Sequence, residues 1–383
     1  MEDVIRERLP VQLLTSLAYT PLCCTESKGD DMMKFGLLTL FDHYPEDCSE
    51  QQYYQQFFDE VTYAEALGFD SVWIGEHHFD RYICPAPQIV AAAIAQRTTK
   101  IRIGTAIVLL PHHNPIRLAE DYAMVDLLSG GRLDFGVGRG FLKATYDGFN
   151  QAMGESRERF QEGLEIITRA WTQESFSYAG KFHTFHNVSV LPRPVQRPTP
   201  PIYVAALISP ESFVKAGQQG HSLLLAPFLQ PLSTLKEQVQ LYRQTLIQAG
   251  HSPDQVEIVA GYHSFVDETP ERARRTWETH YMRYLRFVGS LLAPSVELDP
   301  AQYASWQGRA EDLRQVTFAD MYPDQVLCGD PAQCVERIGL LREALGITHF
   351  WVYMDLGGLD QRALRSSMER FASRVMPMCR KSG

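Results

Sequence analysis

Residues 101–140 read IRIGTAIVLLPHHNPIRLAEDYAMVDLLSGGRLDFGVGRG and contain a complete strand–helix–strand unit. The first ten residues are mostly aliphatic, which predicts a buried strand over Ile101–Leu110. Apolar residues at helical spacing then predict a helix over Ile116–Leu128, and Leu133–Val137 is a second short apolar run. Two buried strands that are joined through a helix are typical of a parallel sheet.

The same alternation extends in both directions from this unit. Eight strand candidates alternate with amphipathic helices, which favours a closed (β/α)8 TIM barrel in the α/β class. The pattern alone also permits an open, doubly wound sheet. The expected strands are Lys34–Leu40, Ser71–Gly75, Ile101–Leu110, Leu133–Val137, Pro201–Ala206, Leu223–Ala226, Val256–Tyr262 and Phe350–Met354. The expected helices cover residues 50–67, 88–96, 116–128, 156–171, 210–219, 235–249, 331–345 and 362–375, and one more begins at Pro270.

Two segments interrupt this alternation. Residues 176–200, after the fourth helix, are rich in aromatic residues and proline, and we expect an inserted loop or short hairpin there. Residues 286–328 contain several prolines and predict a long, lid-like loop before the last helical unit. In barrels of this kind the loops after the C-terminal ends of the strands build the active site, so motifs in those loops carry the most weight.

The composition is that of a large globular domain. The chain has 383 residues, of which 45% are hydrophobic and 21% are charged, and no stretch is long and apolar enough for a membrane span. A net charge of −10 argues against nucleic acid and leaves a small molecule or a protein as the partner. Seven scattered cysteines predict free thiols in a reducing cytoplasm. We expect residues 1–31 to be a disordered extension of a domain that covers residues 32–380.

The second expected strand ends in the sequence EHHF, at residues 76–79. Adjacent side chains at a strand end point to opposite sides, so one imidazole can face the barrel mouth and act as a general base. A pair of structural histidines explains the motif equally well. A zinc site needs a third ligand, which His112 or His113 would supply, but no HExxH spacing supports one and we expect no metal.

Three further strand ends carry residues that suit a flat or phosphorylated ligand. The small residues at 104–106 let a flat ligand lie on the backbone, and the glycines at 136–140 allow a close approach beside Arg139, which suits a phosphate. Ser209 and Pro210 are typical of a helix N-terminus, whose free amides also suit a phosphate. Plain turns and helix capping explain the same residues without a ligand.

Together these motifs resemble the bacterial luciferase-like, flavin-dependent monooxygenase family, and most closely its luciferase α-subunit type. The resemblance covers nearly everything from Met33 to Met378. It rests on EHHF, on residues 104–140, on VAALISPES after the fifth strand and on VLCGDPAQCVERI near the C-terminus. Each motif alone is weak, whereas the combination is specific.

The resemblance implies a barrel that binds reduced FMN at its mouth. A separate flavin reductase would supply the reduced flavin, and O₂ would be the co-substrate. A small organic substrate would then be oxidised through a flavin 4a-hydroperoxide, by hydroxylation, aldehyde oxidation or Baeyer–Villiger insertion. A homodimer is expected as well, because the family commonly pairs through barrel helices.

The resemblance also assigns roles to individual residues. It gives His77 the catalytic role, and it places a non-prolyl cis peptide at the Ala106–Ile107 bond. The segment from Leu285 to Phe318 corresponds to a mobile loop that shields the reaction from water. The residues expected to bind the cofactor are Ala106, Ile107, Gly138, Arg139, Arg157, Ser209, Glu211 and Ser212. Candidate walls of the substrate pocket are Phe41, Phe141, Phe228 and Trp306, which are equally plausible as core aromatics.

The sequence departs from the luciferase pattern at two places, Gly138 and the pair Leu207-Ile208, where luciferase has a glutamate-serine pair, and two alternatives remain open. Luciferase α-subunits have a reactive cysteine where Gly138 stands, so a biosynthetic or degradative monooxygenase fits better than light emission. A deazaflavin-dependent hydride-transfer enzyme shares the barrel and several of the motifs. A non-catalytic flavin-binding partner subunit is the second alternative, and the histidine at position 77 argues against it.

Overall fold

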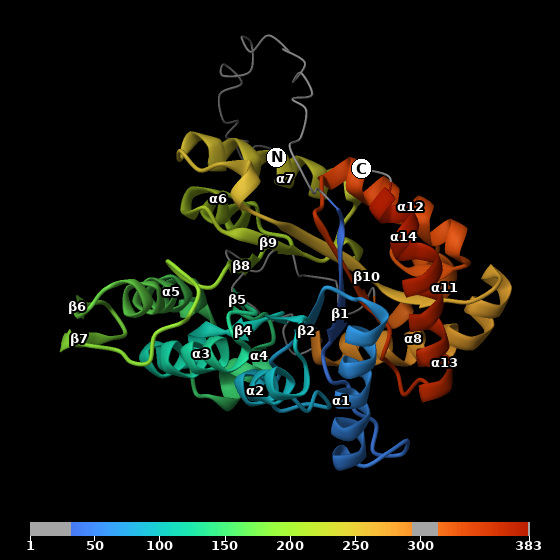
Figure 1. Ribbon diagram of the computed structural model, residues 1–383, viewed down its shortest axis with the longest axis horizontal. Coiled ribbons are helices and arrows are strands. Elements are labelled where there is room, and N and C mark those ends of the chain that lie inside the picture. Colours follow the sequence, from blue (N-terminus) through green and yellow to red (C-terminus); the bar gives the residue numbers. More distant parts are fainter. Residues whose placement is uncertain (1–31, 293–312, 382–383) are drawn as a thin grey trace, which may run out of the picture. The chain divides into compact units, whose positions relative to one another are not determined.

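Eight parallel strands close into a barrel in the computed structural model, which describes residues 32–292 and 313–381 (Figure 1). Each strand pairs with the next, and the last pairs with the first from Lys34–His349 to Leu37–Val352. This closure confirms the expected (β/α)8 barrel and excludes an open sheet. In pairing order the strands are β1 (Lys34–Thr39), β2 (Ser71–Ile74), β3 (Arg102–Thr105), β5 (Leu133–Gly138), β8 (Ile202–Ala205), β9 (Ser222–Leu225), β10 (Ile258–Val266) and β12 (His349–Tyr353).

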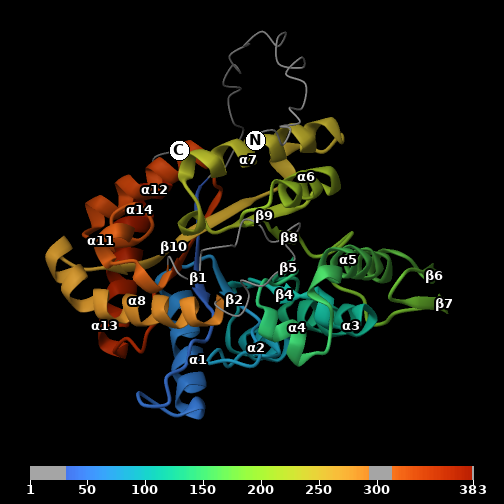
Figure 2. The same ribbon diagram turned by 180° about the vertical axis from the view of Figure 1, so that it is seen from behind.

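Helices follow the strands and cover the outside of the barrel (Figures 1 and 2). The longer ones are α1 (Glu50–Leu67), α2 (Pro87–Arg97), α3 (Pro115–Ser129), α5 (Ser156–Thr172), α6 (Pro210–Gln219), α7 (Leu232–Gln248), α8 (Pro270–Leu292), α12 (Pro331–Leu345) and α13 (Gln361–Arg370). The shorter ones are α4 (Lys143–Gly148), α11 (Phe318–Met321) and α14 (Met376–Lys381). Proline at the first position starts α2, α3, α6 and α12, where its missing N–H costs no hydrogen bond.

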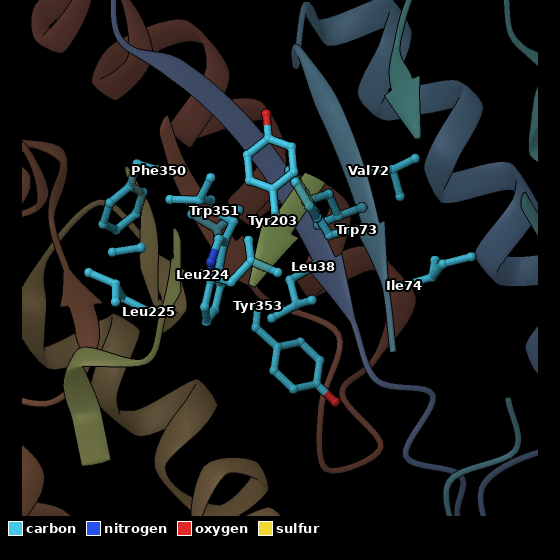
Figure 3. Close-up of a cluster of buried hydrophobic side chains, with 14 of the residues drawn as sticks. Leu38, Val72, Trp73, Ile74, Tyr203, Leu224, Leu225, Phe350, Trp351 and Tyr353 are labelled. Atoms are coloured by element: carbon cyan, nitrogen blue, oxygen red, sulfur yellow. The ribbon is translucent and has the colours of Figure 1, made fainter. Parts of the chain in front are cut away.

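The inside of the barrel is filled by large side chains that pack against glycines on neighbouring strands. The Trp73 ring on β2 lies edge-on to the Tyr203 ring on β8, with centroids 5.1 Å apart, and its Nε1 donates to Ser71 Oγ at 2.7 Å (Figure 3). A Cβ atom on Gly104 of β3 would lie 2.2 Å from the Trp73 ring, and one on Gly36 of β1 would lie 2.9 Å from it. Both glycines therefore make room for one indole.

Several expected boundaries change, among them the strand expected over Val256–Tyr262, which is β10 at Ile258–Val266; three other changes are described here. The strand expected over Ile101–Leu110 is interrupted at the Ala106–Ile107 bond, so that β3 is followed by a separate short strand, β4 (Val108–Leu109), which pairs with β5. The insertion contains an antiparallel hairpin of β6 (Phe176–Ala179) and β7 (Thr184–Val188), one of the two expected forms. Residues 286–292, expected in the loop, continue α8 because the helical burial pattern extends to Leu292.

Parts of the chain that carried expectations lie outside the described residues. They are the N-terminal extension at residues 1–31 and most of the expected lid, at residues 293–312. After the lid, the short strand β11 (Leu327–Gly329) pairs with β10. None of the helices in the described ranges combines the length and the apolar composition that a membrane crossing requires.

Replacing Gly104 with alanine should destabilise the barrel by about 1–3 kcal/mol, because the new methyl group collides with the Trp73 ring in a closely packed interior. The matched control is Gly339→Ala in α12, where an added Cβ meets nothing within 4 Å. That change should stabilise the protein by about 0.5–1 kcal/mol, because alanine favours the helix. Chemical denaturation of both variants measures the difference, and equal effects would refute this account of the packing.

Candidate active site

A cavity of about 250 Å³ lies at the C-terminal ends of the barrel strands. Its walls come from the connections that follow β2, β3, β5, β8 and β9, and from α8. This is the end at which barrels of this fold carry their active sites. The structure brings together in this cavity eight residues that the sequence singled out: His77, Ala106, Ile107, Arg139, Phe141, Ser209, Ser212 and Phe228.

The His77 imidazole faces the cavity and stacks on the Tyr82 ring, with centroids 4.0 Å apart. The His77 backbone N–H donates to the carbonyl of Cys84 at 3.1 Å, which fixes the position of the residue. Neither imidazole nitrogen has a hydrogen-bond partner among the described residues. Burial lowers the pKa of His77 to about 4, so the ring is neutral at neutral pH. A neutral imidazole can accept a proton from a ligand in the cavity or share its own N–H with one.

Beside His77, the Glu76 carboxylate ties three segments of the cavity wall together. Glu76 Oε1 accepts hydrogen bonds from Nε2 of His78 at 2.7 Å and from Nε2 of His113 at 2.6 Å. Glu76 Oε2 accepts from the Leu109 backbone N–H at 2.9 Å. Burial alone would raise the pKa of Glu76, but the hydrogen bonds from His113, His78 and Leu109 outweigh it and lower the pKa to about 2.

The same cluster is the one place in the described residues where three metal-ligating groups converge. The ligand atoms of Glu76, His78 and His113 lie within 4.8 Å of one another, so they could hold a metal ion. HExxH spacing could not have revealed this set, because His113 arrives from a different loop. Both imidazoles already bind the carboxylate, which explains the cluster without an ion, and the absence of a metal stays a prediction.

One wall of the cavity is formed by Ala106 and Ile107. The peptide bond between them is cis, which confirms the expectation from the resemblance. Gly138, on β5, does not line the cavity, but a Cβ atom there would lie 2.0 Å from Cδ1 of Ile107. Glycine at this position therefore leaves room for the Ile107 side chain, which does line the cavity.

Arg139 and the start of α6 contribute polar groups to the lining of the cavity. Arg139 follows β5, and the Tyr146 hydroxyl donates to its backbone carbonyl. Ser209 occupies the N-cap position and Pro210 the first helical position, as expected. The Ser209 side chain, however, makes no capping hydrogen bond, so a purely structural cap does not explain it.

Two residues expected at the cofactor phosphate form an ion pair with each other. Arg157, on α5, pairs with Glu211, on the first turn of α6. The side chain of Glu211 is 63% exposed, and neither residue is among those that line the cavity. The structure thus places both residues beside the start of α6 but does not bring them into the cavity.

The expected aromatic walls separate into two groups. Phe141 and Phe228 line the cavity. Phe41 does not: it is fully buried in the core and its ring lies 4.6 Å from that of Phe57, so its expected place in the substrate pocket is not supported. Trp306 lies outside the described residues.

Sequence reasoning missed Tyr82 and Tyr284, which line the cavity, and it named His112 only as a possible metal ligand. His112 Nδ1 lies 2.7 Å from Oε1 of Gln151, and burial lowers the pKa of His112 to about 4. The hydroxyls of Tyr82 and Tyr284 are 3.3 Å apart although 202 positions separate the residues. No local sequence pattern indicates such a contact.

Several characterised proteins are similar to this chain over nearly its whole length. It is 27% identical to the alkanal monooxygenase alpha chain of the Kryptophanaron alfredi symbiont, over 90% of this chain and 98% of that protein. It is 26% identical to the oxygenase component of the flavin-dependent trigonelline monooxygenase of Acinetobacter baylyi, over 90% of this chain and 95% of that protein.

Solved structures share the fold. Monooxygenase RslO1 from Streptomyces bottropensis superposes with a TM-score of 0.79 and 31% identity, covering 90% of this chain and 99% of that one. The oxygenating constituent of 3,6-diketocamphane monooxygenase from Pseudomonas putida, in complex with FMN, superposes with a TM-score of 0.76 and 23% identity. The match covers 90% of this chain and 98% of that one. An F420-dependent secondary alcohol dehydrogenase superposes with a TM-score of 0.70 and 21% identity, and the match covers 91% of this chain and 99% of that one.

The sequence model described as luciferase-like monooxygenase matches residues 33–349, which is most of the chain. The match includes the strand ends that build the cavity. The chain therefore belongs to the luciferase-like monooxygenase family.

Proposed function

We propose that this chain is the oxygenase of a two-component system, which uses externally reduced FMN and O₂ to oxidise a small, mainly apolar molecule. The observation that carries the proposal is the arrangement of the cavity. Arg139, the start of α6, the Ala106–Ile107 segment and the neutral imidazole of His77 all line the same space.

The residues of the cavity fit a flavin. Arg139 and the hydroxyls of Ser209 and Ser212 would hold the phosphate, close to the positive end of the α6 dipole. The Ala106–Ile107 wall would support the flat ring system. Reduced flavin, when bound, supplies the electrons that activate O₂.

The remaining side chains would control water and protons. Phe141, Leu142, Val288 and Leu292 give the cavity an apolar side that excludes water from the reacting groups. His77 would accept or return a proton at an imidazole nitrogen. Glu76 holds the neighbouring backbone and thereby positions His77 without taking part in the reaction itself.

The partners and location belong to the same proposal. The trigonelline relative is named as an oxygenase component, which supports a separate reductase. A homodimer is supported by exposed apolar side chains on two neighbouring helices, Ile89 on α2 and Met124, Leu127 and Leu128 on α3. The five cysteines in the described ranges form no disulfide, in keeping with a reducing cytoplasm. We retain residues 32–380 as the catalytic domain and residues 1–31 as an extension.

Replacing Arg139 with alanine should weaken the binding of reduced FMN about tenfold to a hundredfold, because it removes a charge-assisted contact to the phosphate. Anaerobic titration measures the affinity. Arg117→Ala is the control, since its side chain is 70% exposed on α3 and lies outside the cavity. Unchanged affinity in Arg139→Ala would refute the phosphate assignment.

The same titration distinguishes FMN-dependent oxygenation from the deazaflavin alternative. That alternative is included because an F420-dependent dehydrogenase shares the fold. We expect reduced FMN to bind and O₂ to be consumed in step with substrate. Binding of a deazaflavin in preference to FMN, without O₂ uptake, would favour hydride transfer instead.

Replacing His77 with alanine should lower product formation by about a hundredfold or more while leaving the affinity for reduced FMN unchanged, because the proton-handling group is lost and the phosphate contacts remain. Product analysis with a reductase and a substrate panel measures the rate. His186→Ala, at an exposed position on β7, is the control. Wild-type turnover in His77→Ala would contradict the assigned role and would reopen the possibility of a non-catalytic partner subunit.

A further inference from the structure

Two tyrosine hydroxyls meet at the apolar side of the cavity. Tyr82 comes from the loop after β2 and Tyr284 from α8, and both line the cavity. Their hydroxyl oxygens are 3.3 Å apart, and both side chains are almost fully buried. The pair is therefore a polar spot within a largely apolar wall.

The two hydroxyl groups carry two O–H donors, but only one of them can donate to the other group within the pair. One O–H donates to the other oxygen, which leaves the second O–H without an acceptor in the part of the chain that the structure describes. A buried donor without an acceptor costs free energy, so such a group is expected to meet an acceptor on a bound molecule. Burial raises the pKa of both tyrosines, which keeps both hydroxyls protonated.

The surroundings indicate what that molecule looks like. The Tyr82 ring stacks on His77 at 4.0 Å, so an oxygen held by the pair would lie near the imidazole. The nearby lining is apolar and comes from described parts of the expected lid region, Val288 and Leu292 at the end of α8 and Leu313 further along the chain. A phosphate is disfavoured here, since the basic residue of the cavity, Arg139, belongs to a different strand end.

We propose that Tyr82 and Tyr284 form a hydroxyl anchor that donates a hydrogen bond to an acceptor oxygen of the substrate. The anchor selects apolar molecules that carry such an oxygen over hydrocarbons of the same shape, and it holds the oxygen-bearing end beside His77. This inference rests on the proposed function and assigns a specificity-determining role to two residues outside the family motifs described above.

The test compares the binding of two matched probes, a tert-butyl-substituted cyclohexanone and the corresponding cyclohexane, measured by equilibrium dialysis. Wild-type protein should bind the ketone about fivefold to tenfold more tightly than it binds the hydrocarbon. One net hydrogen bond provides a difference of this size. The double variant Tyr82→Phe/Tyr284→Phe should lose this preference and should keep its affinity for the hydrocarbon, because only the two hydroxyls are removed.

Tyr281→Phe is the matched control. Tyr281 lies on the same helix, is fully buried and does not line the cavity, and its hydroxyl has no partner in the described ranges. It should retain the ketone preference. Tyr82→Phe should reduce the preference, since the remaining hydroxyl loses the partner that orients it.

The anchor is refuted if wild-type protein shows no ketone preference, if the double variant Tyr82→Phe/Tyr284→Phe keeps it, or if Tyr281→Phe loses it equally. Both probes bind without turnover, so these outcomes are independent of whether the protein oxidises anything. Failure of the proposed monooxygenase activity would instead appear in the titrations with reduced FMN and in O₂ consumption.

Discussion

The indole of Trp73 occupies the inside of the barrel, and the positions around it have to leave space for it. Gly36 on β1 and Gly104 on β3 lie under the ring on either side, and Tyr203 meets it from across the barrel. These contacts set how closely the strands approach and fill the centre of the sheet. Leu38, Leu224 and Trp351 lie in the same cluster and also line the cavity (Figure 3). The packed interior of the barrel therefore forms part of the lining of the candidate site.

Much of this fold could be predicted because the deciding signals are local. A buried run between turn residues predicts a strand wherever it stands, and proline before or glycine after a helical pattern predicts the ends of α3 and α12 to within a residue or two. Aliphatic composition alone could not predict that the run from Ile101 to Leu110 changes direction at Ala106–Ile107. The extension of α8 was missed because prolines further along the chain suggested that the loop begins earlier.

The candidate site divides in the same way. His77, Arg139 and Ser209 lie within four residues of a strand end, so a barrel that gathers its strand ends must gather them too. Phe41 also follows a strand, yet its backbone has a φ of 65°, and its ring packs into the core rather than the cavity. Contacts between distant segments, such as Glu76 with His113 or Tyr82 with Tyr284, depend on how loops fold back over the barrel. No spacing in the sequence encodes them.

The lining of the cavity has one more consequence, which concerns damage by the oxidant that such a cavity would handle. Any reduced flavin that reacts with O₂ without substrate releases peroxide where it forms, and thiols and thioethers are the side chains that peroxide attacks first. Neither cysteine nor methionine occurs among the described residues that line this cavity. If the proposed function holds, the described wall thus offers peroxide no sulfur to attack.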